Sequence, residues 1–584
     1  MALVAAMLLA TVGGATTAAR AASPGAGTVS TTSSGASWTG GPFALPNVSA
    51  ATGSLTCGAA TPCDDYALTV DVPAGYDTDH DLKVKVSWPD TAADFDIYLY
   101  DASGAEVGQA ATTSDPETLV VPPVGGTYRV RVVPFTPLGD TYSATAELVA
   151  KPASTPGPVG AASFATYPAP GTLPRAHDAG EPSIGINWKT GKVMYQAYTD
   201  TYRVSFDDSS APATSVWEDK SAHLPSCTAN ASLDPILYTD HDTGRTFESQ
   251  LAGKTSLMCF TDDDGETWTL SQGGGINSGV DHQTVGGGRW SPNGVGGVGL
   301  YPNAVYYCSQ DIADALCAGS RDGGLTFGPA VPMYTLLDCG GLHGHVKVSP
   351  KDGTVYVPNK GCGGSQAVAV SEDNGLTWQV RPVPSSLPAD SDPSVGVAAD
   401  GTVYFGYQNA DGHAHVAVSH DHGRTWDSDQ DVGAALGVKN VVFPAVVAGD
   451  PDRAAFAFLG TTTGGNYQDP QNFTGEWHLY VAVTYDGGVT WSLTDATPQD
   501  PVQKGSICTG GTTCGTDRNL LDFMDVQIDK QGRVLVGYAD GCTGACATGG
   551  AQNFDALATI ARQSGGRTLF AAYDPVTTAK AKKK

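Results

Sequence analysis

Short runs in which apolar and polar residues alternate recur along almost the whole chain, separated by glycine, serine, aspartate and proline. Alternation with a period of two residues is typical of β-strands that have one buried face. Leu82–Trp88, Phe95–Tyr100 and Thr127–Val132 are clear examples. The 73 glycines and the 16% of charged residues also fit a protein rich in turns. The pattern therefore predicts an all-β protein.

One octet recurs five times: Ser or Thr, any residue, Asp, any residue, Gly, any residue, Thr and an aromatic residue. An Asp at the third position can accept hydrogen bonds from the turn, and Gly at the fifth supplies a positive φ. The Thr hydroxyl can close the turn, and the aromatic ring can pack into a neighbouring sheet. The octets are Thr261–Trp268, Ser320–Phe327, Ser371–Trp378, Ser419–Trp426 and Thr484–Trp491.

This repeat resembles the Asp-box of the sialidase (BNR) superfamily of β-propellers, over roughly 174–573. A second repeat accompanies it: a short apolar strand, a Gly-containing hairpin and a returning strand. Seven such openings predict a seven-bladed propeller, with six blades as the fallback, and place the octets between third and fourth strands at the rim. The openings begin at Glu181, Asp234, Asp281, His345, Asp392, Pro444 and Asp525.

The strands of 55–150 predict a β-sandwich accessory domain that resembles the bacterial pre-peptidase C-terminal domain. Asp94, Asp96 and Asp101 could hold calcium there, or form an exposed polar face. Around this domain we expect a secretory signal peptide (1–22), which ends in Ala19-Arg20-Ala21, and a flexible lead-in rich in Ser, Thr and Gly (23–54). A Pro-rich linker (151–173) and a basic tail (574–584) complete the chain.

Twelve cysteines in an exported chain predict disulfides. Proximity in the sequence pairs them as Cys57/Cys63, Cys227/Cys259, Cys308/Cys317, Cys339/Cys362, Cys508/Cys514 and Cys542/Cys546. A net charge of -28 argues against nucleic acid or an anionic membrane as partner, because both would be repelled. We expect a secreted monomer without a membrane span that acts on a glycan or polysaccharide.

Ligands of propellers gather where the innermost strands begin, at the mouth of the ring. Carboxylates and imidazoles converging there could act as general acids and bases or bind a metal, although each could also only cap a strand. The sequence requires no cofactor, and calcium or another divalent metal is possible. The candidate catalytic residues are Glu181, Asp281, His282, His343, His345, Asp392 and Asp525, with Asp234 assigned to substrate binding and Asp522 lying nearby.

The sialidase resemblance implies a tyrosine nucleophile paired with a glutamate, an aspartate acid/base and three arginines that grip the substrate carboxylate. The Arg-Ile-Pro signature of that family has no match, and Glu181-Pro182 stands in its place. Substrate-binding arginines would then be Arg175, Arg289 and Arg518, and the nucleophile Tyr538 or Tyr407. A mouth richer in carboxylate than in guanidinium should repel sialic acid.

Three hypotheses follow. The first is a secreted sialidase-like glycoside hydrolase, of which an exo-α-sialidase is one form. The second is another carbohydrate-active enzyme, a hydrolase or a lyase, that uses an Asp/His mouth with or without a metal. The third is a non-catalytic propeller that binds a glycan or a protein.

Overall fold

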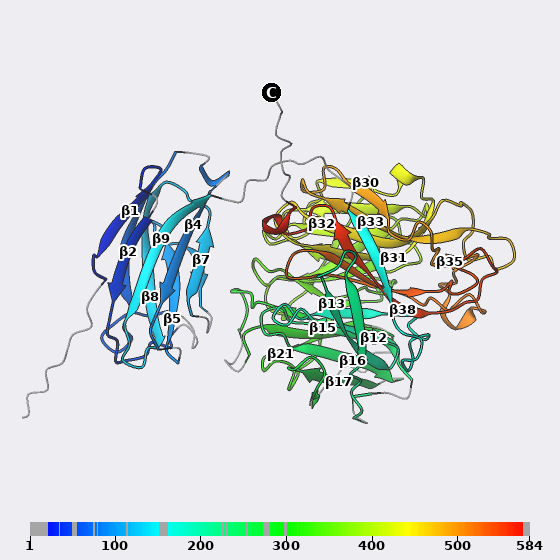
Figure 1. Ribbon diagram of the computed structural model, residues 1–584, viewed down its shortest axis with the longest axis horizontal. Helices are drawn as coiled ribbons and strands as arrows, with labels where there is room; N and C mark the ends of the chain where they lie inside the picture. Colours follow the sequence, from blue (N-terminus) through cyan, green and yellow to red (C-terminus); the bar gives the residue numbers. More distant parts are fainter. Residues whose placement is uncertain are drawn as a thin grey trace, which may run out of the picture. The chain divides into compact units, whose positions relative to one another are not determined.

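The computed structural model forms two compact units, residues 1–155 and 156–584. Figure 1 shows many strands and hardly any helix in both units. The structure describes residues 22–33, 35–49, 55–73, 76–78, 80–90, 92–111, 115–150, 162–224, 227–228, 231–252, 255–271, 281–296, 301–311 and 314–575. The short 3-10 helices in this part are η2 (Tyr76–Thr78), η3 (Ala434–Leu436), η4 (Gly511–Thr513) and η5 (Ala571–Tyr573). None of the helices found there is long and apolar enough to cross a membrane.

The first unit contains two sheets that share one hydrophobic core, to which Trp38, Tyr66, Val84 and Ile97 contribute. The strands expected over 82–88, 95–100 and 127–132 are confirmed. One sheet contains, in spatial order, β1 (Ala26–Ser30), β3 (Asp64–Asp71), β8 (Gly126–Thr136), β5 (Asp94–Tyr100) and β6 (Glu106–Ala110). The other contains β2 (Gly35–Gly40), β9 (Tyr142–Ala150), β4 (His80–Ser87) and β7 (Glu117–Val121).

The expectation of a flexible lead-in over 23–54 is wrong for the part of it that the structure describes. β1 pairs in parallel with β3, and β2 pairs with β9, so the segment adds a strand to each sheet. Its few large residues explain the order: Val29 and Trp38 are buried, and the Trp38 ring stacks on Tyr66 at 3.8 Å. The small polar residues between Val29 and Trp38 make the alternation of buried and exposed positions hard to detect in the sequence.

Asp96 also departs from the expected exposed face, because its side chain is only 5% exposed. Burial, together with the nearby Asp94 and Glu117, raises the pKa of Asp96 to about 8. Asp101 instead accepts hydrogen bonds from the backbone of its own turn, at Ser103 (2.9 Å) and Ala105 (3.0 Å). The groups that the described residues offer to a metal ion do not include these three aspartates.

The described part of the second unit contains seven antiparallel sheets of four strands, one of which carries an extra strand. The first three contain β11 (Ser183–Ile186), β12 (Val193–Ala197), β13 (Asp200–Asp207) and β14 (Thr214–Asp219); β15 (Leu233–Thr239), β16 (Thr246–Ala252), β17 (Thr255–Thr261) and β18 (Thr269–Leu270); and β19 (Asp281–Gly288), β20 (Ala304–Gln310), β21 (Asp314–Ser320) and β22 (Val331–Thr335). The next two contain β23 (Lys347–Val348), β24 (Val355–Cys362), β25 (Ser365–Ser371) and β26 (Gln379–Pro382); and β27 (Ser394–Val397), β28 (Val403–Gln408), β29 (Ala414–Ser419) and β30 (Ser428–Asp431). The last two contain β31 (Asn440–Ala448), β32 (Ala454–Thr461), β33 (Glu476–Thr484) and β34 (Ser492–Asp495), with β35 (Gln503–Lys504) beside β33; and β36 (Asp525–Ile528), β37 (Val534–Asp540), β38 (Leu557–Gly565) and β10 (Ser163–Pro168).

The first strands of these sheets contact one another in a closed cycle, from β11 through β15, β19, β23, β27, β31 and β36 back to β11. Hydroxyl groups help to join them, since Ser183 Oγ accepts from Leu237 N (2.9 Å) and Ser394 Oγ from Val446 N (2.9 Å). The arrangement is propeller-like, with the innermost strands around an axis.

The last sheet is completed by β10, which precedes the first sheet in the chain and pairs with β38. The predicted linker over 151–173 is therefore wrong for 163–168, which is an outermost strand. Residues 1–21 of the expected signal peptide and residues 576–584 of the tail lie outside the described residues. Asp574, at the start of that tail, is held by Arg453 at 2.9 Å.

All five octets form the same turn between the third and fourth strands of their sheets, as predicted. In the third copy Asp373 accepts from Thr377 N (2.9 Å), Thr377 Oγ1 (2.6 Å) and Ser371 Oγ (2.9 Å), and Gly375 has φ 80°. In the fourth copy the aromatic residue reaches the preceding sheet, where the Trp426 indole donates to Pro382 O at 3.0 Å. The turns therefore use their carboxylates locally, away from the axis.

All six predicted disulfides are present, namely Cys57–Cys63, Cys227–Cys259, Cys308–Cys317, Cys339–Cys362, Cys508–Cys514 and Cys542–Cys546. Each closes a short loop, with sequence separations of 4 to 32 residues. Disulfides of this kind form and persist in oxidising compartments.

Candidate functional site

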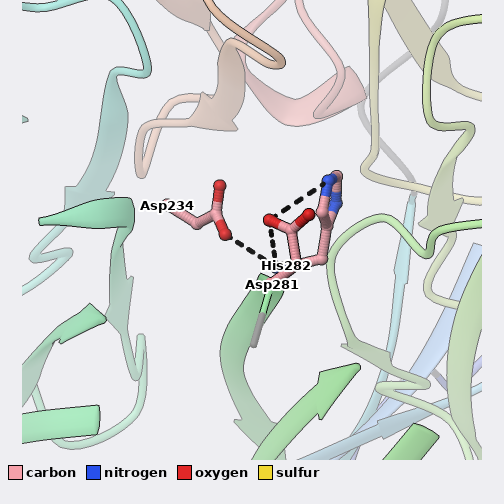
Figure 2. Close-up of side chains that lie close together, drawn as sticks. All are labelled: Asp234, Asp281 and His282. Atoms are coloured by element: carbon pink, nitrogen blue, oxygen red, sulfur yellow. Dashed lines mark hydrogen bonds and ion pairs between the residues drawn. The ribbon is translucent and has the colours of Figure 1, made fainter. Parts of the chain in front are cut away.

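Four carboxyl groups and one imidazole meet where the innermost strands begin. We call this group the axial cluster; it consists of Glu181, Asp234, Asp281, His282 and Asp522. In each of two overlapping triples, Asp234/Asp281/His282 and Glu181/Asp234/Asp522, oxygen or nitrogen atoms lie within 4.8 Å of one another. Either triple could hold a divalent cation. Figure 2 shows the first triple, with the Asp234 carboxylate directed at the start of β19.

The backbone at two of these positions is unusual, and the carboxylates stabilise it. Asp234 and His282 have φ of 48° and 51°, and the register shifts at the start of β15 and of β19. Glu181 accepts from the backbone N–H of Asp234 at 3.2 Å, and Asp234 accepts from that of His282 at 2.6 Å. The carboxylate before the first strand of one sheet thus accepts a hydrogen bond from the bulged backbone at the start of the next sheet. The bulge turns the side chain that follows it toward the axis.

Glu181 and Asp234 are buried, with 5% and 3% exposure. Burial and the neighbouring carboxylates of Asp234 and Asp522 raise the pKa of Glu181 well above its usual range. Burial raises the pKa of Asp234 to about 7, and hydrogen bonding to Asp281 acts in the same direction. Two buried carboxyl groups therefore hold protons near neutral pH and share them with neighbouring carboxylates.

Asp281 and Asp522 are the members that face solvent, with side-chain exposures of 46% and 24%. Arg518 grips Asp522 with both terminal nitrogens, at 2.6 and 2.5 Å. The cluster thus has a buried, proton-holding layer and an outer layer that a substrate could touch.

Behind the cluster lies a buried ion-pair chain. His282 Nδ1 lies 2.7 Å from one oxygen of Asp392, and Lys360 Nζ lies 3.0 Å from the other. Burial disfavours a charged His282, but Asp392 outweighs it and raises the pKa of His282 well above its usual range. For Asp392, burial is outweighed by His282 and Lys360, which lower its pKa.

The charges of this region balance only if the carboxyl groups hold protons or a cation is bound. Five carboxyl groups face three cations, His282, Lys360 and Arg518. Two negative charges remain, and burial makes unpaired charge costly. The protons on Glu181 and Asp234 supply the balance.

His343, His345 and Asp525, three of the predicted catalytic residues, lie outside the cluster. With Phe523 they line a cavity of about 20 Å³ along the axis, room for about one water molecule. Burial lowers the pKa of His343 to about 4 and that of His345 to about 3, so both are neutral. Asp525 accepts from Ser183 Oγ (3.0 Å) and Ile184 N (3.1 Å), as a strand cap would.

Of the three arginines expected to bind substrate, only Arg518 reaches the cluster. Arg175 is exposed and pairs with Asp178 at 3.0 Å. Arg289 follows β19, whose first residue is Asp281, so the length of the strand separates it from the cluster. The tyrosine candidates fail as well: Tyr407 donates to Asp429 at 2.7 Å, and Tyr538 is buried in a hydrophobic core.

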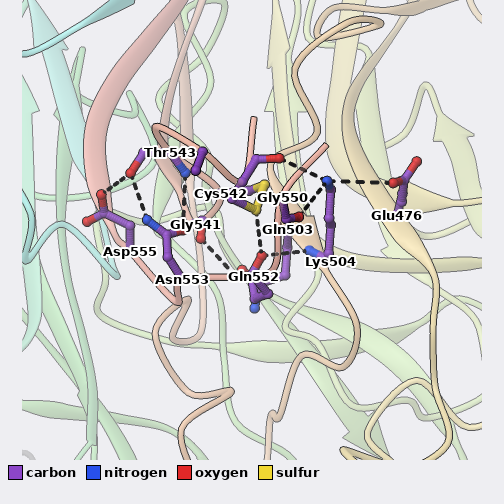
Figure 3. The surroundings of a disulfide bond; sticks show 12 residues. Glu476, Gln503, Lys504, Gly541, Cys542, Thr543, Gly550, Gln552, Asn553 and Asp555 are labelled. Carbon is purple, nitrogen blue, oxygen red and sulfur yellow. Dashed lines mark hydrogen bonds and ion pairs between the residues drawn. A yellow bond between two sulfur atoms is a disulfide. The ribbon is translucent and has the colours of Figure 1, made fainter. Parts of the chain in front are cut away.

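The segment that carries Arg518 and Asp522 is tied to the loop closed by the Cys508–Cys514 disulfide, since Cys508 N donates to Asp517 O at 3.0 Å. Figure 3 shows the surroundings of the Cys542–Cys546 disulfide, where Gln552 donates to Gly541 O (2.8 Å) and Lys504 lies near Glu476 (3.9 Å). Asn519, in the same segment as Asp522, donates to Asp555 O at 2.6 Å and so joins this segment to the residues near the second disulfide. These contacts fix the segment in which Asp522 lies.

Sequence reasoning missed Lys360, which compensates Asp392. It lies near the end of β24, the second strand of its sheet, which runs back toward the mouth. A lysine at the mouth-facing end of a second strand is a weak signal, but it could have been added to the candidates.

No family model matches the sequence, and no curated protein matches it. Among solved structures, the chain is similar to a GH74 enzyme from Niastella koreensis, with TM-score 0.40 and 16% identity, over 65% of this chain and 51% of that one. It is also similar to an intramolecular trans-sialidase from Ruminococcus gnavus, with TM-score 0.32 and 12% identity, over 66% and 96% of the two chains. A NanB sialidase from Streptococcus pneumoniae gives TM-score 0.33 and 8% identity, over 83% and 94%. Likenesses this distant carry no argument about the reaction.

Proposed function

We propose that this protein is an extracellular glycoside hydrolase on a seven-bladed Asp-box β-propeller with a β-sandwich accessory domain. The convergence of four carboxyl groups from separate sheets in the axial cluster carries the proposal. The seven sheets in cyclic contact and the five identical octet turns support the propeller. The six disulfides support an extracellular location.

Hydrolysis of a glycosidic bond needs a proton donor for the leaving oxygen and a second carboxylate that acts as base or nucleophile. Asp234 holds a proton near neutral pH and is hydrogen-bonded to Asp281, which faces solvent. The proton can therefore pass through Asp281 to the leaving oxygen. Asp522, paired with Arg518, supplies the second carboxylate. Glu181, which is buried and hydrogen-bonded to Asp522, shares its own proton with Asp522.

The charge of the cluster favours a neutral or cationic sugar over a sialic acid. An acidic substrate would bring another carboxylate against Asp281 and Asp522 in a partly buried site, where like charges repel strongly. Arg518, the arginine at the cluster, is already paired. We therefore propose a glycosidase of the second hypothesis, which uses aspartates, in preference to an exo-α-sialidase.

A screen of the purified protein against neutral, amino-sugar and sialylated glycans tests the proposal, with reducing ends and released sugars as readouts. We expect turnover of a neutral or amino-sugar glycan, lost in Asp281→Asn and Asp522→Asn. Release of sialic acid alone would restore the first hypothesis. Binding without turnover, unchanged in both variants, would leave the non-catalytic hypothesis.

A further inference from the structure

The described part of the chain begins inside the core of the first unit. The backbone nitrogen of Ala22 donates to Asp64 Oδ1 at 2.7 Å, and Tyr142 Oη donates to Oδ2 at 2.7 Å. Ala22 is 7% exposed and Asp64 is 3% exposed. The first described residue is therefore a buried partner of a buried carboxylate.

This carboxylate has a shaped pocket but no counter-charge. A Cβ at Gly40 would lie 2.3 Å from Asp64 Oδ2, so the pocket requires glycine there. Among the described residues no basic side chain pairs with Asp64, whereas its exposed neighbour Asp65 pairs with Arg131 at 2.7 Å. Burial raises the pKa of Asp64, although the hydrogen bonds from Tyr142 and Ala22 oppose this. A buried carboxylate is stabilised most by a charged donor, which a peptide N–H is not.

The residues that follow Ala22 join the two sheets of the unit. Ser23 exchanges backbone hydrogen bonds with Thr39 near the end of β2, at 2.9 and 3.1 Å. Gly25 O accepts from Ala67 N of β3 at 3.0 Å. The position of the Ala22 nitrogen is thus fixed by pairing with both sheets.

The sequence places a processing signal directly before this nitrogen. Ala19-Arg20-Ala21 satisfies the small-any-small rule for cleavage by a signal peptidase, and cleavage after Ala21, one residue before the end of the signal peptide expected over 1–22, makes Ala22 the first residue. The new amino group would be the atom that contacts Asp64.

We propose that a signal peptidase hydrolyses the Ala21–Ala22 bond and that the α-ammonium of Ala22 then forms a buried ion pair with Asp64. Water supplies the hydroxyl that makes the Ala21 carboxylate and a proton for the Ala22 nitrogen. The α-amino group, with a usual pKa of about 7.7–8.0, takes a further proton from solvent near neutral pH. The first unit reaches its full stability only after this cleavage. The inference rests on the export proposed above, but not on the reaction at the axial cluster.

The protein purified from the secretion medium gives the first test, by mass spectrometry of its N-terminal peptide. We expect the mature chain to begin at Ala22. A chain that begins at another residue, or an uncleaved chain, would overturn the proposal. A glycan-hydrolysis assay of the same sample reports separately on the proposed function.

The second test compares two full-length proteins made without a scar, one beginning at Ala22 and one with a single Gly before it. We expect hydrogen exchange in the peptides of β3 and β9 to be about tenfold faster in the extended protein, because the charged donor is lost. Asp64→Asn should abolish this difference, and the matched control Asp65→Asn should not. Equal exchange in the two proteins would overturn the proposal.

Chemical labelling covers the case in which Asp64→Asn does not fold. With an amine-reactive acetylating reagent, the α-amine of the Ala22 form should react at least about tenfold more slowly than that of the Gly-extended form, because a buried, paired ammonium is protected. Equal labelling rates would contradict the ion pair.

Discussion

The octet turns and the axial cluster both depend on aspartates, but their surroundings shift the pKa of those aspartates in opposite directions. In the octets each Asp accepts several short hydrogen bonds from its own turn; in Asp421, partial burial is outweighed by the bonds from Thr425, which lower its pKa to about 2. In the axial cluster Asp234 accepts one backbone N–H but lies beside other carboxyl groups, and burial raises its pKa to about 7. Donors surround one carboxyl group, and acceptors surround the other.

Position in the propeller-like ring separates aspartates that stabilise a turn from carboxyl groups that can take part in acid–base chemistry. Each octet supplies hydrogen-bond donors to its own Asp from within eight residues. The charge of that Asp is therefore compensated locally, before the sheets assemble. At the axis each sheet contributes a carboxyl group, and the assembly of the ring forces them together. Proton-sharing therefore arises from the tertiary structure.

The largest expected effect is on turnover. Asp281→Asn should lower kcat by about 10²–10⁴-fold, the usual contribution of a positioned acid or base. The octet variant Asp373→Asn should retain kcat within about twofold, because its carboxylate lies at the rim and contributes nothing to the acid–base catalysis that kcat reports. Steady-state kinetics on the substrate found in the screen measure both. Equal losses in the two variants would remove the distinction between rim and axis.

The two regions should also respond to pH with opposite sign. Asp234 keeps its proton in the folded state, so its contribution to stability is full below the unfolded pKa of 3.8 and is lost as pH rises through about 7. The loss is up to about 4 kcal/mol, at 1.36 kcal/mol per pKa unit. Urea unfolding between pH 4 and pH 8 should show a smaller decline in Asp234→Asn than in the wild type. For Asp421 the contribution is full above 3.8 and is lost as pH falls through about 2.

Stability at fixed pH gives a third contrast. Asp373→Asn should destabilise the second unit by about 2 kcal/mol, since charge-assisted hydrogen bonds to Thr377 and Ser371 weaken. Asp234→Asn keeps an acceptor for the His282 N–H and removes a buried negative charge, so at pH 8 it should cost less than that. Urea titrations of both variants measure the difference. A larger cost for Asp234→Asn would indicate that its charge stabilises the fold.

A smaller effect is expected from Arg518→Lys. Lysine keeps the positive charge but not the two-nitrogen grip on Asp522, so kcat should fall about tenfold with little change in stability. The pH–rate profile is the informative readout, because the apparent pKa on its acidic side should change when Asp522 loses the guanidinium of Arg518. An unmoved profile would argue against Asp522 as the second carboxylate.

The smallest expected effect is that of chelation. Protons on Glu181 and Asp234 balance the cluster, so treatment with EDTA should leave kcat within about twofold, without the loss that removal of a catalytic metal causes. Calcium, added back after EDTA, is the control. Loss of turnover that calcium restores would instead support the metal-dependent form of the second hypothesis.

The sequence predicted the features that local chemistry determines. The octet turns, the six disulfides and the strands over 82–88 and 95–100 depend on residues that are close in sequence. The seven openings also located Glu181, Asp234 and Asp281, because each is the first polar residue before a short apolar strand. These residues proved to lie together at the axis.

The remainder depended on distances that the sequence does not contain. Lys360 pairs with Asp392 across two sheets, and Arg518 pairs with Asp522. Arg289 was misplaced because nothing local indicates at which end of a strand a residue faces the axis. The sequence of 23–54 does not reveal the strands there, because two buried residues, Val29 and Trp38, give too little periodicity to detect.

The pairing of β10 with β38 has a consequence for how the second unit is made. Ser163 and Ser564, whose hydroxyl groups lie 3.1 Å apart across this pair, are 401 residues apart in the sequence. The outermost strand of the final sheet thus leaves the ribosome long before its neighbour exists, and its edge stays unpaired until β38 has been synthesised. Contacts of such separation form slowly, so a chain that stalls late would present β10 as an open edge to other molecules.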